Sequence, residues 1–295
     1  MSGPTLDHPQ PVDISVTSEN DIRRLIHMMK LTRREILEKS PRLAGAVAMG
    51  LPLAAPVLAE EPSTAQRKLK VVAVGGHVDD PQGGCGGAMA LHAEQGHEVV
   101  ALSLTHGDSE PIAGQLGISN KELAARRSAD AIKSCALLKA RMIFMDQIDL
   151  HTEITPARYQ EFSRTMLAEK PDIVFTHWPI DTHPDHRVAS LLTYNTWLDA
   201  GLKFELYYYE VETGRQTQHF FPNHYVDITP VEARKREACF TNGATIEGWW
   251  GLHEAMQRFR GMEYGCKAAE GFVHMSSRLI CPPPFWQHGC RYAEE

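Results

Sequence analysis

The chain lacks the features that mark several large classes of protein. It has no internal repeat and no low-complexity segment, and its 43% hydrophobic and 23% charged residues are ordinary globular usage, which excludes collagen-like, coiled-coil and disordered chains. It also has no basic excess, because 30 Lys and Arg stand against 37 Asp and Glu for a net charge of −7. Binding of nucleic acid by charge alone is therefore excluded. Histidine, in contrast, is abundant, with 15 residues in a chain of 295.

A long uninterrupted hydrophobic run is also missing. The apolar stretch 43–59 contains two glycines and two prolines and is short for a bilayer span. Paired arginines, Arg33 and Arg34, precede it, and it ends in an A-x-A-like site at Ala59. This order is typical of a secretory signal, and the arginine pair favours the twin-arginine route, which exports folded proteins. An uncleaved membrane anchor is the alternative.

We therefore expect residues 1–59 to be a twin-arginine signal with an N-terminal extension, and residues 60–295 to form one domain. The mature protein is expected in the periplasm or outside the cell, with no membrane span after processing. All six cysteines lie after the signal, at irregular spacing and without a CxxC pair. Disulfides are permitted in such a compartment, and Cys281 and Cys290 could close a loop across the prolines between them.

From residue 69 onward, short apolar runs alternate with segments of helical character. Strands separated by helices predict βαβ units and a mostly parallel sheet. The expected strands are 69–74, 98–104, 142–145, 172–176, 204–209 and 224–228. The expected helices are 88–95, 121–138, 156–169, 184–198 and 230–239.

Parallel strands end at one edge of a sheet, and ligands of open α/β sheets bind outside that edge. The loop after Val74, with His77, Asp79 and Asp80, and the loop after Thr176, with the sequence 177–186, should therefore face the same crevice. Two histidines and an aspartate that converge from separate loops can hold a zinc ion and leave a fourth position for water. Such a zinc lowers the pKa of its water and polarises a carbonyl group.

Two other patterns in the chain carry less chemistry. The glycine-rich stretch 83–87 lacks the GxGxxG spacing of a dinucleotide site, so we interpret these glycines as close packing of a helix on a strand. Trp249 and Trp250 form either a core corner or an aromatic wall for a sugar ring, and core is favoured. The remaining scattered histidines show no pattern and are interpreted as surface or packing residues; they are His92, His97, His219, His253 and His288.

The motifs His77-Val78-Asp79-Asp80, Leu104-Thr105-His106-Gly107 and His183-Pro184-Asp185-His186 resemble those of the PIG-L/LmbE-like de-N-acetylases. The likeness runs from about Lys70 to the strand at Tyr225 and the helix around Lys235. The resemblance implies a Rossmann-like three-layer fold and zinc-dependent removal of an N-acetyl group from an N-acetylglucosamine-type sugar or a related small amide.

Carried over by position, the resemblance also implies site residues. His77, Asp80 and His186 would be the zinc ligands, and Asp79 the general base that activates the water. His183, held by Asp185, would stabilise the oxyanion or protonate the amine. Arg127, with Asp130 three residues on, would contact the substrate.

The chain departs from the family pattern at two places in the first motif, since Val78 replaces a usual proline and Gln82 replaces an acid. The lost charge at Gln82 could weaken the zinc site. A non-catalytic periplasmic carbohydrate-binding module that retains the fold is therefore the second hypothesis, and a nucleotide-binding protein is the third. The oligomeric state and the particular acyl substrate are not indicated by the sequence.

Overall fold

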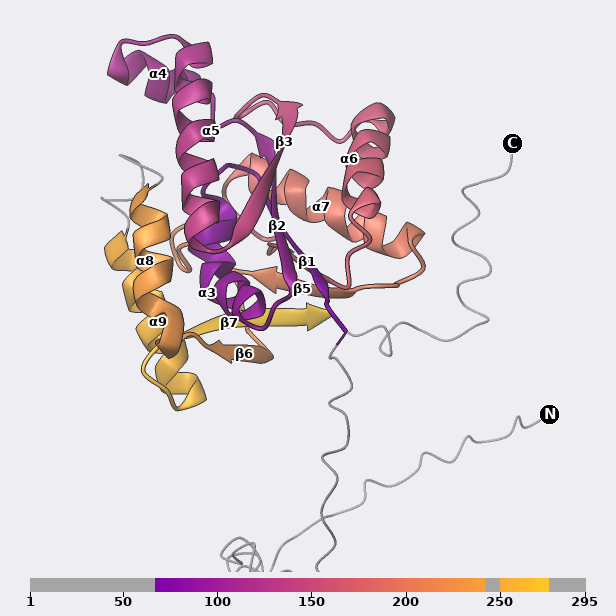
Figure 1. Cartoon of the computed structure of the whole chain (residues 1–295). Coiled ribbons are helices and arrows are strands. Elements are labelled where there is room, and N and C mark those ends of the chain that lie inside the picture. Colours follow the sequence, from indigo (N-terminus) through magenta and orange to yellow (C-terminus); the bar gives the residue numbers. More distant parts are fainter. Residues whose placement is uncertain (1–66, 242–249, 276–295) are drawn as a thin grey trace, which may run out of the picture. The chain divides into compact units, whose positions relative to one another are not determined.

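Seven strands of the described residues pair into one sheet, in the order β3-β2-β1-β4-β5-β7-β6 (Figure 1). Strands β1 to β5 are parallel, and β7 runs antiparallel to both β5 and β6. The predicted mostly parallel sheet is thus confirmed. The strands are β1 Lys70–Gly75, β2 Glu98–Thr105, β3 Ala140–Gln147, β4 Ile173–His177, β5 Glu205–Tyr209, β6 His224–Asp227 and β7 Ala269–Met275.

The structure is a computed structural model that describes residues 67–241 and 250–275. The predicted signal 1–59, Trp249 and the pair Cys281 and Cys290 lie outside the described residues. Within them, no helix is long and apolar enough to cross a membrane. Trp250 is buried against Cys239 and Phe240, as expected for a core residue.

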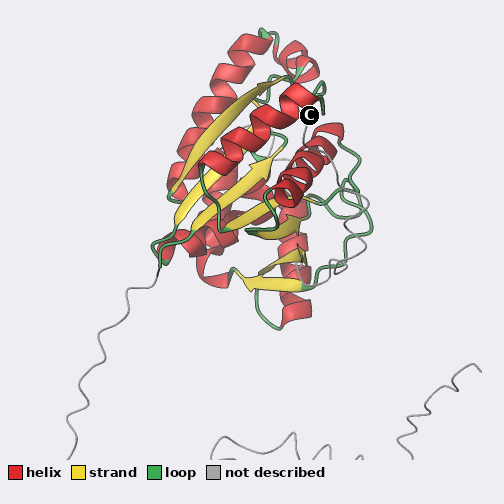
Figure 2. Cartoon of the chain, turned by 90° about the vertical axis from the view of Figure 1, so that its right-hand side faces the viewer, coloured by secondary structure: helices red, strands yellow, loops and turns green. Residues whose placement is uncertain are grey.

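Helices cover both faces of the sheet (Figures 1 and 2). In strand β1, Val71 and Ala73 belong to the core beneath α3, α5 and α8, whereas Val72 and Val74 belong to the core beneath α6 and α7. This alternation is how a strand buried on both faces distributes its side chains. The helices are α3 Asp80–Glu94, α4 Glu110–Leu116, α5 Asn120–Leu137, α6 Pro156–Ala168, α7 Pro184–Asp199, α8 Glu232–Thr241 and α9 Trp250–Tyr264.

The strand order reverses between β1 and β4. From β1 the chain builds outward through β2 and β3, then returns to pair β4 with the other side of β1. The carboxyl ends of two such neighbouring strands form the crevice where α/β sheets bind ligands. The two loops singled out in the sequence leave these strands, so the expectation that they share a crevice is confirmed.

Helix α3 begins at Asp80, earlier than the predicted 88–95, and includes the glycine-rich stretch. It is kinked at Cys85, whose φ of −140° is not helical. A Cβ on Gly84 would lie 2.2 Å from the Tyr209 ring, and one on Gly87 would lie 2.4 Å from Ile228. These glycines therefore serve close packing, as interpreted from the sequence.

A buried ion pair anchors the second half of α3. The Glu270 carboxylate accepts the backbone N–H groups of Gly87 and Ala88 at 2.7 and 2.8 Å, and Lys235 Nζ lies 2.7 Å from the same carboxylate. Both charged side chains are 2% exposed. Because a carboxylate at free helical N–H groups satisfies donors that the kink leaves unpaired, strand β7 holds the helix that carries the first site loop.

Candidate active site

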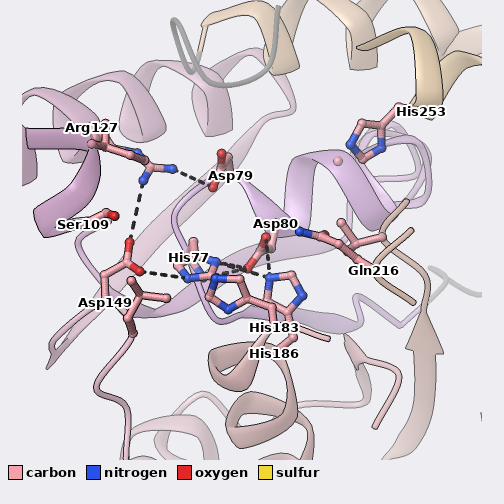
Figure 3. Close-up of a pocket in the computed structure, with 14 residues that line it drawn as sticks. His77, Asp79, Asp80, Ser109, Arg127, Asp149, His183, His186, Gln216 and His253 are labelled. Carbon is pink, nitrogen blue, oxygen red and sulfur yellow. Dashed lines mark hydrogen bonds and ion pairs between the residues drawn. The ribbon is translucent and has the colours of Figure 1, made fainter. Parts of the chain in front are cut away.

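The predicted site residues converge at the reversal of strand order (Figure 3). His77, Asp79 and Asp80 lie between the end of β1 and the start of α3, and Asp79 is the residue before that helix. His183 is the N-cap of α7, and His186 lies in its first turn. Helices α3 and α7 therefore both begin at the crevice, where their N-terminal N–H groups make the local field positive.

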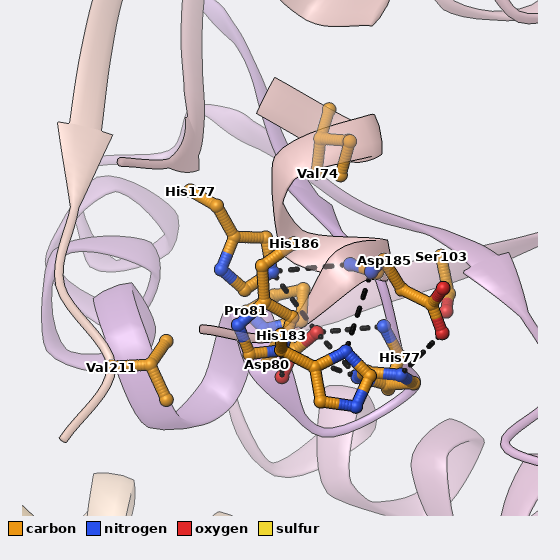
Figure 4. A network of polar contacts seen from close by, with 12 residues as sticks. Val74, His77, Asp80, Pro81, Ser103, His177, His183, Asp185, His186 and Val211 are labelled. Carbon is orange, nitrogen blue, oxygen red and sulfur yellow. Dashed lines mark hydrogen bonds and ion pairs between the residues drawn. The ribbon is translucent and has the colours of Figure 1, made fainter. Parts of the chain in front are cut away.

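The three predicted metal ligands present their donor atoms to one another (Figure 4). His77 Nδ1 lies 3.2 Å from Asp80 Oδ2, His186 Nε2 lies 3.3 Å from His77 Nδ1, and His186 Nε2 lies 3.4 Å from Asp80 Oδ1. A tetrahedral zinc with bonds of about 2.0–2.1 Å places its ligand atoms about 3.3–3.4 Å apart. The two histidine nitrogens have this spacing, and each approaches a different oxygen of the Asp80 carboxylate, so the donor set is consistent with a metal site.

Each ligand histidine is backed by a carboxylate on its other ring nitrogen. His77 Nε2 lies 3.1 Å from Asp185 Oδ2, and His186 Nδ1 lies 3.2 Å from Asp181 Oδ1. This carboxylate–histidine arrangement fixes the tautomer and the orientation of metal-binding histidines. Asp181 is held in turn by Thr217, whose hydroxyl lies 2.9 Å from Asp181 Oδ2.

The charges of the site also favour a cation. Burial would lower the pKa of both ligand histidines, but the charge of Asp80 and hydrogen bonds to carboxylates outweigh it. The pKa of His186 rises to about 9, and that of His77 rises well above its ordinary value. For Asp80, burial would raise the pKa, but the charges of His186, His177 and His77 lower it well below its ordinary value. A divalent cation would supply the positive charge that these protonated histidines supply here.

Asp185 does not support His183 in the way the resemblance implied. Its carboxylate accepts from Leu150 N at 2.7 Å and from the Thr152 hydroxyl at 2.6 Å, and it faces His77. Burial would raise the pKa of Asp185, but the bonds from His77 and Thr152 lower it to about 2. Only the backbone N–H of Asp185 reaches His183, at 3.3 Å from Nδ1. Asp185 is the second residue of α7, and from this position its side chain points toward His77 at the end of β1 rather than toward His183.

His183 stands next to the ligands as a neutral ring. Its ring centre lies 4.5 Å from that of His77 and 4.7 Å from that of His186. Burial, followed by the positive charges of those two histidines, lowers the pKa of His183 to about 4. His183 therefore offers a neutral imidazole to the crevice at neutral pH.

Asp79 and Arg127 form an ion pair over the crevice. Arg127 Nη2 donates to Asp79 Oδ1 at 3.0 Å, and Nη1 donates to the Gly107 carbonyl at 3.2 Å. Asp149 lies 3.9 Å from the same guanidinium. Asp130, which follows Arg127 by three residues in the family pattern, pairs with Lys133 at 3.0 Å.

The structure adds residues that the sequence reasoning missed. Asp149 follows β3 at the same sheet edge, so the edge rule that found the two loops could have found it. His177 is the last residue of β4, and its Nε2 atom lies 3.0 Å from Asp80 Oδ2. Its ring stacks on that of His186, with the ring centres 3.9 Å apart. His177 and His183 also bring donor atoms close enough to share a metal with the predicted ligands. His253 and Gln216 come from segments that carry no motif.

Asp149, His183, Gln216 and His253 line one crevice together with the predicted ligands His77, Asp80 and His186, and the cavity volume is about 140 Å³. The predicted metal ligands lie on one side, and Arg127, Asp149 and Ser109 form one wall. Gln82, whose changed charge was expected to touch the site, points elsewhere: it is fully buried, and its amide donates to Cys135 Sγ at 3.2 Å. The Gln82 amide nitrogen therefore contacts the buried thiol of α5 rather than the predicted zinc ligands.

Residues 72–197 match the sequence model of the family described as PIG-L: GlcNAc-PI de-N-acetylase. Over these residues the chain is similar to the PIG-L family. This confirms the resemblance seen in the motifs, and the matched residues contain every predicted site residue. The second crevice wall, from residues 211, 216 and 253, lies beyond the PIG-L match.

Solved structures share the fold. The 4-carboxy-2-hydroxymuconate hydratase of Pseudomonas putida is 22% identical with a TM-score of 0.64, covering 73% of this chain and 99% of that one. The N,N'-diacetylchitobiose deacetylase of Pyrococcus horikoshii is 22% identical with a TM-score of 0.62, covering 93% and 98%. A zinc-inhibited form of the teicoplanin deacetylase is 13% identical with a TM-score of 0.54, covering 70% and 99%. At these identities the likeness establishes the Rossmann-like α/β architecture that was predicted.

Replacement of a supporting carboxylate should weaken metal binding without removing a ligand. In Asp181→Asn the partner of His186 Nδ1 loses its charge, so we expect zinc affinity to fall about 10–100-fold. Competition with a chromophoric chelator measures the change. The control Asp130→Asn removes a carboxylate charge that pairs with Lys133 and should keep the original affinity. An unchanged affinity in Asp181→Asn would contradict the supporting role.

Zinc affinity should also depend steeply on pH. The pKa of His186 rises to about 9, so its ring carries a proton at pH 7 in the metal-free protein, and zinc must displace that proton. We expect the association constant to rise at least about tenfold per pH unit from pH 6 to 8, since each displaced proton contributes about tenfold. Chelator competition across this range measures the slope, and a flat profile for the unchanged protein would contradict the assignment.

Proposed function

We propose that this protein is a zinc-dependent hydrolase that removes the N-acetyl group from an N-acetylglucosamine-type sugar or a related small amide. The observation that carries the proposal is that His77 Nδ1 and His186 Nε2 lie 3.3 Å apart and that each lies within 3.4 Å of one oxygen of the Asp80 carboxylate, with Asp79 adjacent in the chain. The PIG-L match and the likeness to two deacetylases support it.

The residues divide the chemistry of amide hydrolysis between them. Zinc held by His77, Asp80 and His186 would lower the pKa of a water from ~15.7 toward ~7 and polarise the acyl oxygen. Asp79 then takes the proton of the attacking water as general base. Arg127, bonded to Asp79 at 3.0 Å, fixes the direction of that carboxylate.

His183 acts as a hydrogen-bond donor in this scheme. With its pKa lowered to about 4, it is neutral at pH 7 and can donate to the developing oxyanion. The amine that leaves needs a proton, and Asp79 holds the proton taken from the water. Transfer of that proton to the amine nitrogen returns Asp79 to its starting state and completes the balance of the reaction.

Two other functions fit parts of the observations less well. The similar hydratase also adds water to its substrate, so the fold by itself does not select an amide. The non-catalytic carbohydrate-binding module was motivated by Gln82, which contacts Cys135 and none of the three predicted ligands. Release of acetate separates hydrolysis of an N-acetyl group from both alternatives.

Acetate release from a panel of N-acetylated amino sugars should require zinc and Asp79. We expect chelation to abolish it and zinc to restore it. Asp79→Asn should lower kcat about 10²–10⁴-fold, because a general base contributes that much, while the zinc content stays the same. The control Asp146→Asn, whose side chain is 87% exposed, should retain full activity. Full activity of Asp79→Asn would remove the base assignment.

We further propose that the protein is exported in folded form by the twin-arginine route. The sequence pattern at 32–59 supports this, as do the buried free thiols of Cys85, Cys135 and Cys239. Burial raises the pKa of Cys135 and Cys239 to about 12, so a prefolded chain protects them from oxidation. Replacement of Arg33 and Arg34 by lysine should retain the protein in the cytoplasm, as measured by cell fractionation. Unchanged export would contradict the route.

A further inference from the structure

The crevice has a second wall that the PIG-L motifs do not explain. Val211 and Gln216 belong to the turn after β5, and His253 comes from α9. All three follow the matched residues 72–197. Figure 3 places His253 and Gln216 across the crevice from Arg127 and Asp149. This wall is therefore the part of the crevice that the family match leaves unaccounted for.

His253 is buried yet unsatisfied within the described residues. Its side chain belongs to a residue that is 5% exposed, and Nδ1 is buried with no hydrogen-bond partner there. Gln216 Oε1, on the same wall, is also buried and has no hydrogen-bond partner among the described residues. Unpaired buried polar atoms are costly and rare in folded proteins. The unpaired Gln216 Oε1 on a wall of the crevice indicates that a ligand group belongs there, and His253 lines the same wall.

The packing around His253 fixes its orientation. The His253 ring lies over Gly83 of α3. A Cβ atom on Gly83 would lie 3.1 Å from His253 Cε1. Glycine at this position thus makes room for the imidazole. Burial also lowers the pKa of His253 to about 4, so the ring is neutral.

The neutral ring has one proton to place. A proton on the buried Nδ1 would leave a donor unpaired, whereas a proton on Nε2 leaves only a lone pair unpaired at Nδ1. The second arrangement is favoured, and it directs an N–H group to the crevice. An oxygen acceptor of the substrate is the matching partner.

The acidic surroundings decide which acceptor fits. Six carboxylates lie in or directly behind the crevice, and an anionic ligand would be repelled by them. A neutral hydroxyl oxygen avoids this cost. These residues are Asp79, Asp80, Asp149, Asp181, Asp185 and Glu212.

We propose that His253 is a specificity-determining residue, whose Nε2–H donates to one hydroxyl oxygen of a neutral sugar substrate beside Gln216. The assignment deepens the proposed deacetylase function and rests on it. It places substrate choice in α9 and the turn after β5, whereas the hydrolytic groups lie on the loops after β1 and β4.

The test combines deletion of single hydroxyls with a change at His253. The zinc-loaded protein is assayed with N-acetylglucosamine and with its 3-deoxy, 4-deoxy and 6-deoxy analogues. We expect one analogue to lose about tenfold or more in kcat/KM, mainly through KM, since a lost hydrogen bond to a buried group has this size. In His253→Phe that one discrimination should disappear while the other two persist.

Two variants serve as references. His253→Gln keeps a side-chain donor and should restore part of the discrimination. His274→Phe, in β7, replaces a histidine that pairs with Glu205 away from the crevice and should keep the original pattern. Zinc content and circular dichroism confirm that each variant is folded and loaded.

The outcomes separate the two levels of the proposal. If His253→Phe and the unchanged protein rank all four sugars identically, His253 does not contact the substrate. If no sugar is hydrolysed, the deacetylase function fails, and calorimetric affinities of the same four sugars then decide on His253. Discrimination in binding that disappears in His253→Phe supports the contact, and equal affinity profiles overturn it.

Discussion

The parallel pairing of β1 with β4 is the constraint on which the site depends. These strands are distant in the sequence, yet their register sets Val71 beside Ile173 and Ala73 beside Phe175. Their ends therefore bring His77 and His177 to one place, and the helices that follow begin there. Because strands buried on both faces tolerate no slip in register, the distances between the ligand atoms are set by the core of the sheet rather than by flexible loops.

A surplus of carboxylates gives this place its chemistry. Asp185 and Asp181 support the two ligand histidines, and Asp80 lies between them. The Arg127 guanidinium is directed to Asp79 rather than to Asp80, Asp181 or Asp185. Such a cluster is stable only with a positive partner at its centre. The same acidity that favours a cation discourages anionic substrates, so metal binding and substrate charge have one physical origin.

Much of this arrangement could be predicted from the sequence, because apolar runs mark β1 to β6 and both site loops follow such runs. The rest had no local signal. Strand β7 was missed because Glu270 and Gly271 interrupt its apolar pattern, although the buried Glu270 caps α3. The turn of the Asp185 side chain toward His77, and the pairing of Arg127 with Asp79, depend on how helices meet. His253 lies on a helix without a motif, and only the packing on Gly83 reveals its position.

The Glu270 carboxylate joins the beginning and the end of the fold, since it lies in the final strand described and holds the helix that starts at Asp80. During synthesis on the ribosome, α3 therefore lacks its anchor until nearly the whole domain has emerged. The loop that carries His77, Asp79 and Asp80 therefore reaches its final geometry only after β7 has taken its place in the sheet.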